Sequence, residues 1–84
     1  GPYDALSRIP VVVLLEDVRS MYNVGSFFRT ADGAGVEHLY LAGITARPPK
    51  NQIRKTALGA EETVPWSGVD AAEQVAALRG RGYE

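Results

Sequence analysis

The stretch from residue 19 to residue 32 holds the side chains best suited to chemistry. It reads Arg-Ser-Met-Tyr-Asn-Val-Gly-Ser-Phe-Phe-Arg-Thr-Ala-Asp and follows an apolar run that predicts a strand. A helix that starts here attracts phosphate through its free N–H groups and its dipole. Gly25 would let a phosphate or ribose approach the backbone, and the planar fork of Arg29 can bind a phosphate with two hydrogen bonds. These residues predict an anion site.

The same residues also have purely structural interpretations. Asn23 is a suitable N-cap for the predicted helix. A helical arginine such as Arg29 is most often a solvated surface residue. Phe27 and Phe28 are predicted to pack in the core, because they share the apolar helix face with Val24, Ala31 and Ala34. On the residues alone, both interpretations stay open.

The order of the predicted elements is that of an α/β protein. Residues 11–15 form a continuous apolar run, which is typical of a strand buried on both faces. The further elements predicted from the sequence are a helix over 23–34 ended by glycines, a strand over 36–41, a short helix over 51–58 capped by Gly59, a strand over 63–66, a helix that follows the Asp70–Glu73 capping box, and the start of a fourth strand at 83–84. This alternation predicts a partial parallel sheet with flanking helices and right-handed crossovers, Rossmann-like in its order.

Composition narrows the functional classes. The 84 residues suit one small domain, and the net charge of -1 argues against a strongly basic nucleic-acid binder while permitting a local basic patch. Cysteine is absent and His38 is the single histidine, so these residues predict no disulfide and no zinc site. The longest apolar run is too short to span a membrane. We expect a cytoplasmic protein without a membrane or metal partner.

A second candidate surface lies further along the chain. Residues 47–55 hold four of the nine Lys and Arg residues and no acid, namely Arg47, Lys50, Arg54 and Lys55. Such a run can track the phosphates of an RNA strand. The alternative is a solvated loop and helix face, with Glu61 and Glu62 paired to these cations.

The pattern Asn23-x-Gly25-x-x-x-Arg29-x-Ala31 resembles the first conserved motif of the SpoU/TrmH-like RNA 2′-O-ribose methyltransferases of the SPOUT superfamily. Residues 15–20 and 55–62 agree, and the second of these segments resembles the family's connection between its second and third strands. The resemblance covers residues 11–83. We therefore expect residues 1–84 to be the N-terminal part of a SpoU-type methyltransferase domain, with a leader over 1–10 in which Gly1 and Pro2 are a tag scar.

The resemblance implies transfer of a methyl group from S-adenosylmethionine to a ribose 2′-hydroxyl of rRNA or tRNA. It implies that Arg29 engages an RNA phosphate and helps to deprotonate the hydroxyl, and that Asn23 supports this geometry. A guanidinium is a poor base, so we expect positioning to be its main role. Further RNA contacts are expected at Arg19, Ser20, Gly25, Arg47, Lys50, Arg54 and Lys55.

Two later motifs of the family are absent from the chain. One carries a glutamate after the fourth strand, and the other carries the Ser/Asn-containing segment of the C-terminal trefoil knot. These motifs build most of the cofactor pocket, so we expect the chain alone to bind S-adenosylmethionine poorly and to be inactive. Unpaired sheet edges predict a homodimer or a strand-sharing oligomer. The alternatives are a non-catalytic RNA- or nucleotide-binding half-domain and an assembly half-domain completed by another chain.

Overall fold

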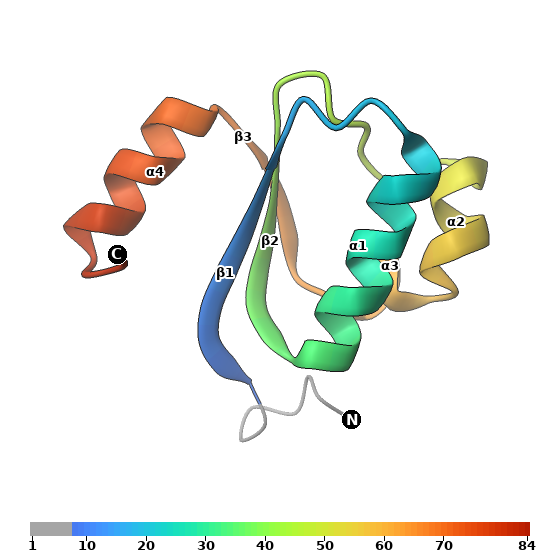
Figure 1. Ribbon diagram of the computed structural model, residues 1–84, viewed down its shortest axis with the longest axis horizontal. Coiled ribbons are helices and arrows are strands. Elements are labelled where there is room, and N and C mark those ends of the chain that lie inside the picture. Colours follow the sequence, from blue (N-terminus) through green and yellow to red (C-terminus); the bar gives the residue numbers. More distant parts are fainter. Residues whose placement is uncertain (1–7) are drawn as a thin grey trace.

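A single parallel sheet forms the centre of the computed structural model, which describes residues 8–84 (Figure 1). Its strands are β1 (Ile9–Glu16), β2 (Val36–Ala42) and β3 (Trp66–Val69), in the order β1-β2-β3. Both neighbouring pairs are parallel. The predicted fold class is therefore confirmed. The strand β1 begins inside the predicted leader, and the proposed tag scar lies outside the described residues.

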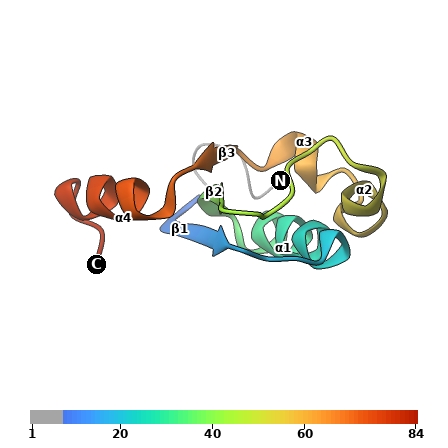
Figure 2. The same cartoon turned by 90° about the horizontal axis from the view of Figure 1, so that it is seen from above.

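Helices cover both faces of the sheet. Helices α1 (Met21–Ala34), α2 (Asn51–Ala57) and α3 (Ala60–Thr63) lie on one side, and α4 (Ala71–Gly80) lies on the other (Figures 1 and 2). The core fills the space between the sheet and the first three helices. Its largest fully buried side chains are Phe28, Leu39, Leu41, Ile53 and Val24. Leu39 and Leu41 share one side of β2 and are both fully buried.

Helix α1 starts two residues earlier than predicted. Ser20 has extended backbone angles, and its hydroxyl accepts the N–H of Asn23 at 3.2 Å, so Ser20 is the N-cap. The prediction that Asn23 caps the helix was wrong, because Met21 packs against the core and draws residues 21 and 22 into the helix. The helix ends as predicted at Gly35, which has a left-handed φ of 71° and donates its N–H to Ala31 at 2.9 Å.

The apolar face of α1 is narrower than the sequence suggested. Phe28 is fully buried, but Phe27 is 41% exposed, so the prediction of Phe27 as a core residue was wrong. The buried positions are Val24, Gly25, Phe28 and Ala31. They repeat at the spacing of one helix face, and residue 27 falls beside that face rather than on it.

The segment after α2 differs most from the prediction. Leu58 is the C-cap of α2 and has a left-handed φ of 53°. Gly59 is also left-handed, with a φ of 93°, and precedes the unpredicted helix α3. This extra turn displaces the third strand from 63–66 to Trp66–Val69. Residues 83–84 form no strand, and the hydroxyl of Tyr83 instead donates a hydrogen bond to Glu37. The predicted cap at Asp70 is confirmed, because its carboxylate accepts the N–H of Glu73 at 3.0 Å.

Candidate functional site

The loops after β1 and β2 are tied together and fix the entry to α1. Asp17 has a left-handed φ of 55°, and its Oδ1 accepts the N–H of Ile44 at 2.9 Å. The buried hydroxyl of Thr45 donates to the carbonyl of Leu15 at 3.2 Å and accepts the N–H of Val18 at 3.0 Å. These bonds lie at the carboxyl ends of parallel strands, where open α/β sheets bind their ligands.

Helices α1 and α2 meet at Gly25. A Cβ atom on this residue would lie 2.0 Å from Oγ1 of Thr56, 2.3 Å from the carbonyl oxygen of Ile53 and 3.0 Å from the nitrogen of Ala57. Thr56 also donates its hydroxyl hydrogen to the carbonyl of Tyr22 at 2.7 Å. The space beside Gly25 therefore belongs to α2. This packing is a structural reason for glycine at position 25, and the approach of a phosphate or ribose to this residue stays a prediction.

A cleft of about 560 Å³ opens where the two helices diverge. Arg29 and Lys55, both exposed, place their cationic side chains in its walls, and no carboxylate lines it. The remaining lining residues are Ser26, Thr30, Thr56 and Leu58. The two cations suit a phosphate, because each can donate charge-assisted hydrogen bonds to its oxygens. Of the hydroxyl groups, those of Ser26 and Thr56 already donate to the carbonyl of Tyr22. We call this feature the Arg29–Lys55 cleft.

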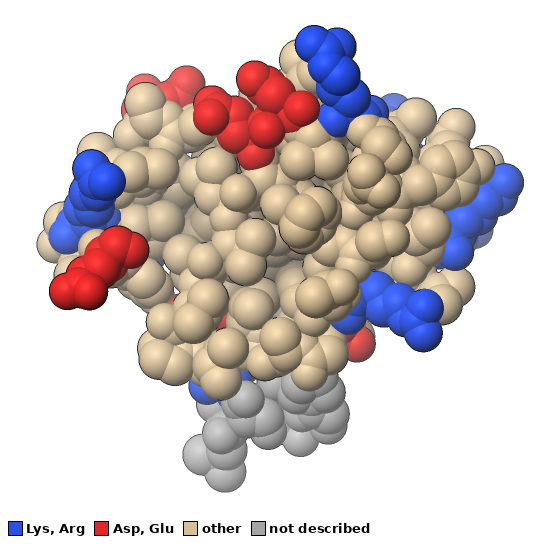
Figure 3. All heavy atoms as spheres, viewed as in Figure 1, with Lys and Arg blue, Asp and Glu red and all other residues tan. Residues whose placement is uncertain are grey.

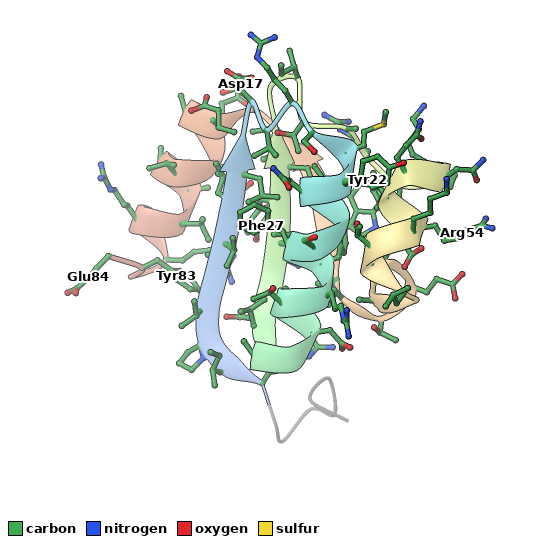
Figure 4. All side chains as sticks on the ribbon, turned by 45° about the vertical axis from the view of Figure 1, so that its right-hand side comes forward. Asp17, Tyr22, Phe27, Arg54, Tyr83 and Glu84 are labelled. Carbon is green, nitrogen blue, oxygen red and sulfur yellow. The ribbon has the colours of Figure 1, made fainter. Side chains whose placement is uncertain are left out.

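Lys50 and Arg54 lie in the wall of a second, smaller pocket. It has a volume of about 200 Å³ and is lined by Pro48, Pro49, Lys50, Ile53, Arg54, Glu61, Glu62 and Trp66. We call it the Trp66 pocket. Glu61 and Glu62 line this pocket together with Lys50 and Arg54, and Oε1 of Glu61 has no hydrogen-bond partner among the described residues. Arg54 points outward from α2 in Figure 4, and Lys and Arg side chains mark the same edge in Figure 3.

The other predicted site residues lie apart from the cleft. The guanidinium of Arg47 lies against β3, where a Cβ on Gly68 would be 2.2 Å from its Cζ. Arg19 and Asn23 are exposed at the start of α1, and Ser20 is engaged in capping it. The basic run is therefore divided among β3 and two sides of α2 instead of forming one stripe.

The opposite face of the sheet carries a polar cluster that the sequence did not reveal. Nε2 of His38 lies 2.8 Å from the hydroxyl of Ser67, and its ring stacks on Tyr40 with centroids 4.5 Å apart. His38 is half-buried. Burial lowers the pKa of His38, and the nearby charge of Glu37 partly opposes this shift. None of these residues lines the Arg29–Lys55 cleft.

Sequence reasoning missed the hydroxyl groups of the cleft. Ser26 and Thr30 are four residues apart and flank Arg29 on α1, a spacing that places them on one helix face. Thr56 could not be found in this way, because its position depends on how α2 packs. Among the described residues, no helix is long and apolar enough to cross a membrane.

The profile of the SpoU rRNA methylase family matches residues 10–84. The chain belongs to this family. Among curated SpoU relatives, the 23S rRNA (guanosine-2′-O-)-methyltransferase RlmB of Pseudomonas aeruginosa is 32% identical over 75 residues, which is 88% of this chain and 30% of that protein. The RlmB protein of Vibrio cholerae is 34% identical over 74 residues, covering 87% of this chain and 30% of its own length. The SpoU chain thus spans less than a third of these relatives.

Solved structures of SpoU-type proteins show the same arrangement. An AdoMet-bound rRNA methyltransferase from Sinorhizobium meliloti superposes with a TM-score of 0.76 and 26% identity, over 86% of this chain and 28% of that one. The TrmH/SpoU tRNA modifying enzyme of A. aeolicus gives a TM-score of 0.77 at 24% identity, over 92% and 40% of the two chains. The second likeness concerns the fold alone.

Proposed function

We propose that this chain is the RNA-holding part of an RNA 2′-O-ribose methyltransferase that acts on rRNA or tRNA with S-adenosylmethionine as methyl donor. The observation that carries the proposal is the Arg29–Lys55 cleft, which is lined by two cations and by no carboxylate. The proposal is further supported by the RlmB relatives, which are 23S rRNA methyltransferases, and by the AdoMet-bound structure from S. meliloti.

Arg29 would act by holding the nucleotide in place. A ribose hydroxyl is a weak nucleophile, so its reaction depends on alignment with the methyl donor and on a proton acceptor. The guanidinium can bind the phosphate beside the reacting ribose with two hydrogen bonds, and Lys55 adds a second charge from the facing helix. Asn23, exposed in the first turn of α1, is proposed to support this geometry. A guanidinium is a poor base, so we assign positioning to Arg29.

The described residues do not fit S-adenosylmethionine. This cofactor carries a cationic sulfonium and an ammonium group, and the Arg29–Lys55 cleft has cations in both walls. A larger cavity of about 720 Å³ between β1 and α4 is lined mainly by apolar residues, and its charged lining residues are Arg79, Arg81 and Glu84. We therefore derive no methyl-transfer step from this chain alone, and we propose that the cofactor binds outside the described residues.

We also propose that the protein works in the cytoplasm as a homodimer or strand-sharing oligomer. The outer edge of β1 has no strand partner within residues 8–84. Ile9 and Val11 on this strand are 41% and 44% exposed. An unpaired apolar strand edge is a template for pairing with another segment.

The test is single-turnover methylation of RNA by the full-length protein carrying Arg29→Ala. We expect the rate to fall by about 10² to 10³, because the lost interaction strengthens toward the transition state. RNA affinity should fall less. Arg29→Lys should not restore the rate, since lysine lacks the planar fork. Arg79→Ala on α4 is the matched control and should leave the rate unchanged.

Three other outcomes of these methylation and stability measurements would change the interpretation of Arg29 or of the proposed function. A normal rate for Arg29→Ala would remove this residue from the active site and refute the proposal. A large drop in melting temperature would make Arg29 structural, which its exposure on α1 does not suggest. RNA binding without methylation by the unaltered full-length protein would instead favour a non-catalytic binding module.

A further inference from the structure

The Trp66 pocket has the size and shape of a site for one ring system. Its volume is about 200 Å³, below the roughly 300 to 1,000 Å³ of pockets that enclose drug-sized ligands. Ile53, which is fully buried, belongs to its lining, and the half-buried Trp66 contributes an aromatic surface. Pro48 and Pro49 add rigid apolar walls. An inserted planar ring would therefore find stacking and apolar contacts here.

Glu61 gives the pocket a hydrogen-bonding preference. Its Oε1 is buried and has no hydrogen-bond partner. A buried carboxylate oxygen without a donor is unfavourable, and a ligand that donates an N–H to it restores a lost hydrogen bond. Lys50 and Arg54 line the same pocket without bonding this oxygen. They remain available for an anionic group on the ligand.

We propose that the Trp66 pocket binds a guanine base of the RNA strand. Guanine presents two adjacent N–H donors, the N1–H and the 2-amino group, which match the two oxygens of the Glu61 carboxylate. The ring stacks on Trp66, as unstacked bases do on aromatic side chains of RNA-binding proteins. Lys50 and Arg54 bind the adjoining phosphate.

This inference rests on the proposed function, because the pocket and the Arg29–Lys55 cleft share α2 as a wall. Lys55 lines the cleft, and its neighbour Arg54 lines the pocket. An RNA strand that crosses α2 meets both. The Trp66 pocket then selects a nearby base while Arg29 holds the reacting nucleotide, which makes Glu61 a specificity-determining residue.

Trp66 itself supplies the measurement, because it is the single tryptophan of the chain. We expect GMP to change its fluorescence on titration. IMP, which lacks the 2-amino group, should bind about tenfold more weakly, and AMP should bind more weakly than GMP. Lys50→Ala should weaken GMP binding and leave free guanosine unaffected, since guanosine has no phosphate.

Variants at Glu61 test whether its carboxylate recognises the guanine base. Glu61→Ala and Glu61→Gln should both reduce the preference for GMP over IMP, and Glu73→Gln on exposed α4 is the matched control that should keep it. Circular dichroism of each variant checks that the fold is retained, and Glu61→Gln, which keeps the side-chain size, remains informative where the alanine variant unfolds.

The proposal is overturned if GMP leaves Trp66 fluorescence unchanged, if GMP and IMP bind equally, or if the Glu61 variants keep the full preference. A guanine-containing RNA oligonucleotide should displace GMP. Failure to displace it would make the pocket a free-nucleotide site and overturn the RNA-base proposal. None of these outcomes touches the methylation test on Arg29, so the two proposals fail separately.

Discussion

Replacing Gly25 by alanine tests whether this residue is glycine because of helix packing or because of ligand approach. Gly25 is buried in α1, and its backbone faces α2. If packing is the reason, the variant loses stability before any RNA is present. If close approach of RNA is the reason, the variant keeps its stability and loses RNA affinity. The two explanations therefore predict opposite results in a simple unfolding experiment.

The expected size of the effect follows from the contacts. The added Cβ would lie 2.0 Å from the hydroxyl of Thr56 and 2.3 Å from the carbonyl oxygen of Ile53, whereas ordinary contacts begin at 3.4 Å. The hydroxyl can rotate away, but the carbonyl belongs to the backbone, so α2 must retreat by roughly 1 Å. Such overpacking costs about 1–3 kcal/mol. The gain of about 0.5–1 kcal/mol from alanine in a helix offsets part of this.

We expect Gly25→Ala to destabilise the protein by about 1–2 kcal/mol, which corresponds to roughly 5–15 °C in melting temperature for a domain of this size. Gly33→Ala is the matched control, because it lies in the same helix with no atom within 4 Å of its added Cβ. It should be neutral or slightly stabilising. A Gly25→Ala variant as stable as the Gly33→Ala variant would refute the packing explanation.

Three shorter predictions address the cap, the histidine and the cations. Ser20→Ala should destabilise the fold by about 1 kcal/mol in urea unfolding, because it removes the N-cap of α1, and an unchanged midpoint would contradict this. Burial lowers the pKa of His38 from its ordinary 6.5, so its neutral form adds stability above that pH, and this stability is lost as the pH falls through the lowered value. Melting temperatures of His38→Gln should therefore decline less on acidification than those of the unaltered protein; an equal decline would exclude this residue as the cause. Lys55→Ala should reduce the slope of log affinity against log salt concentration in RNA binding by about 0.7–0.9. Arg47→Ala should reduce this slope by less, since Arg47 lies against Gly68. Equal reductions would disprove the division of the basic run.

The first half of the fold was predictable because local signals agree there. The apolar run of β1, the helical periodicity of α1 and the left-handed turn at Gly35 each point to one structure. The errors here were the position of the cap, the start of β1 and the burial of Phe27. Ser20 and Asn23 are equally good capping residues, and only the packing of Met21 selects the earlier one.

The segment between α2 and β3 was not predictable in this way. Leu58 adopts a left-handed conformation that a non-glycine residue rarely takes, and its neighbour Gly59 is the residue a sequence would choose. Gly59 is left-handed too, so the departure is the additional left-handed residue Leu58, and Ala57 and Ala60 on either side of the pair are both buried in the core. Four residues of α3 are also too few to show a helical period.

The candidate site also has one part that could be predicted from the sequence and one part that could not. Arg29 could be predicted as a site residue from the sequence, because its planar guanidinium group follows a predicted strand and the start of a predicted helix. The opposing wall could not, since Lys55 reaches the cleft only through the packing of α2 on α1. The packing role of Gly25 could not be predicted for the same reason, because a glycine in a motif does not show whether a ligand or a helix approaches it.

The two segments that carry the family resemblance are in contact with each other. Gly25 belongs to the first and Thr56 to the second, and they meet where the helices are closest. Arg29 lies four residues after Gly25, on the same side of α1, where the helices begin to diverge. The glycine thus lets α2 approach, and the arginine lines the cleft that this approach creates. A larger residue at position 25 would push Lys55 away from Arg29, so the spacing of the motif is a packing constraint as well as a chemical one.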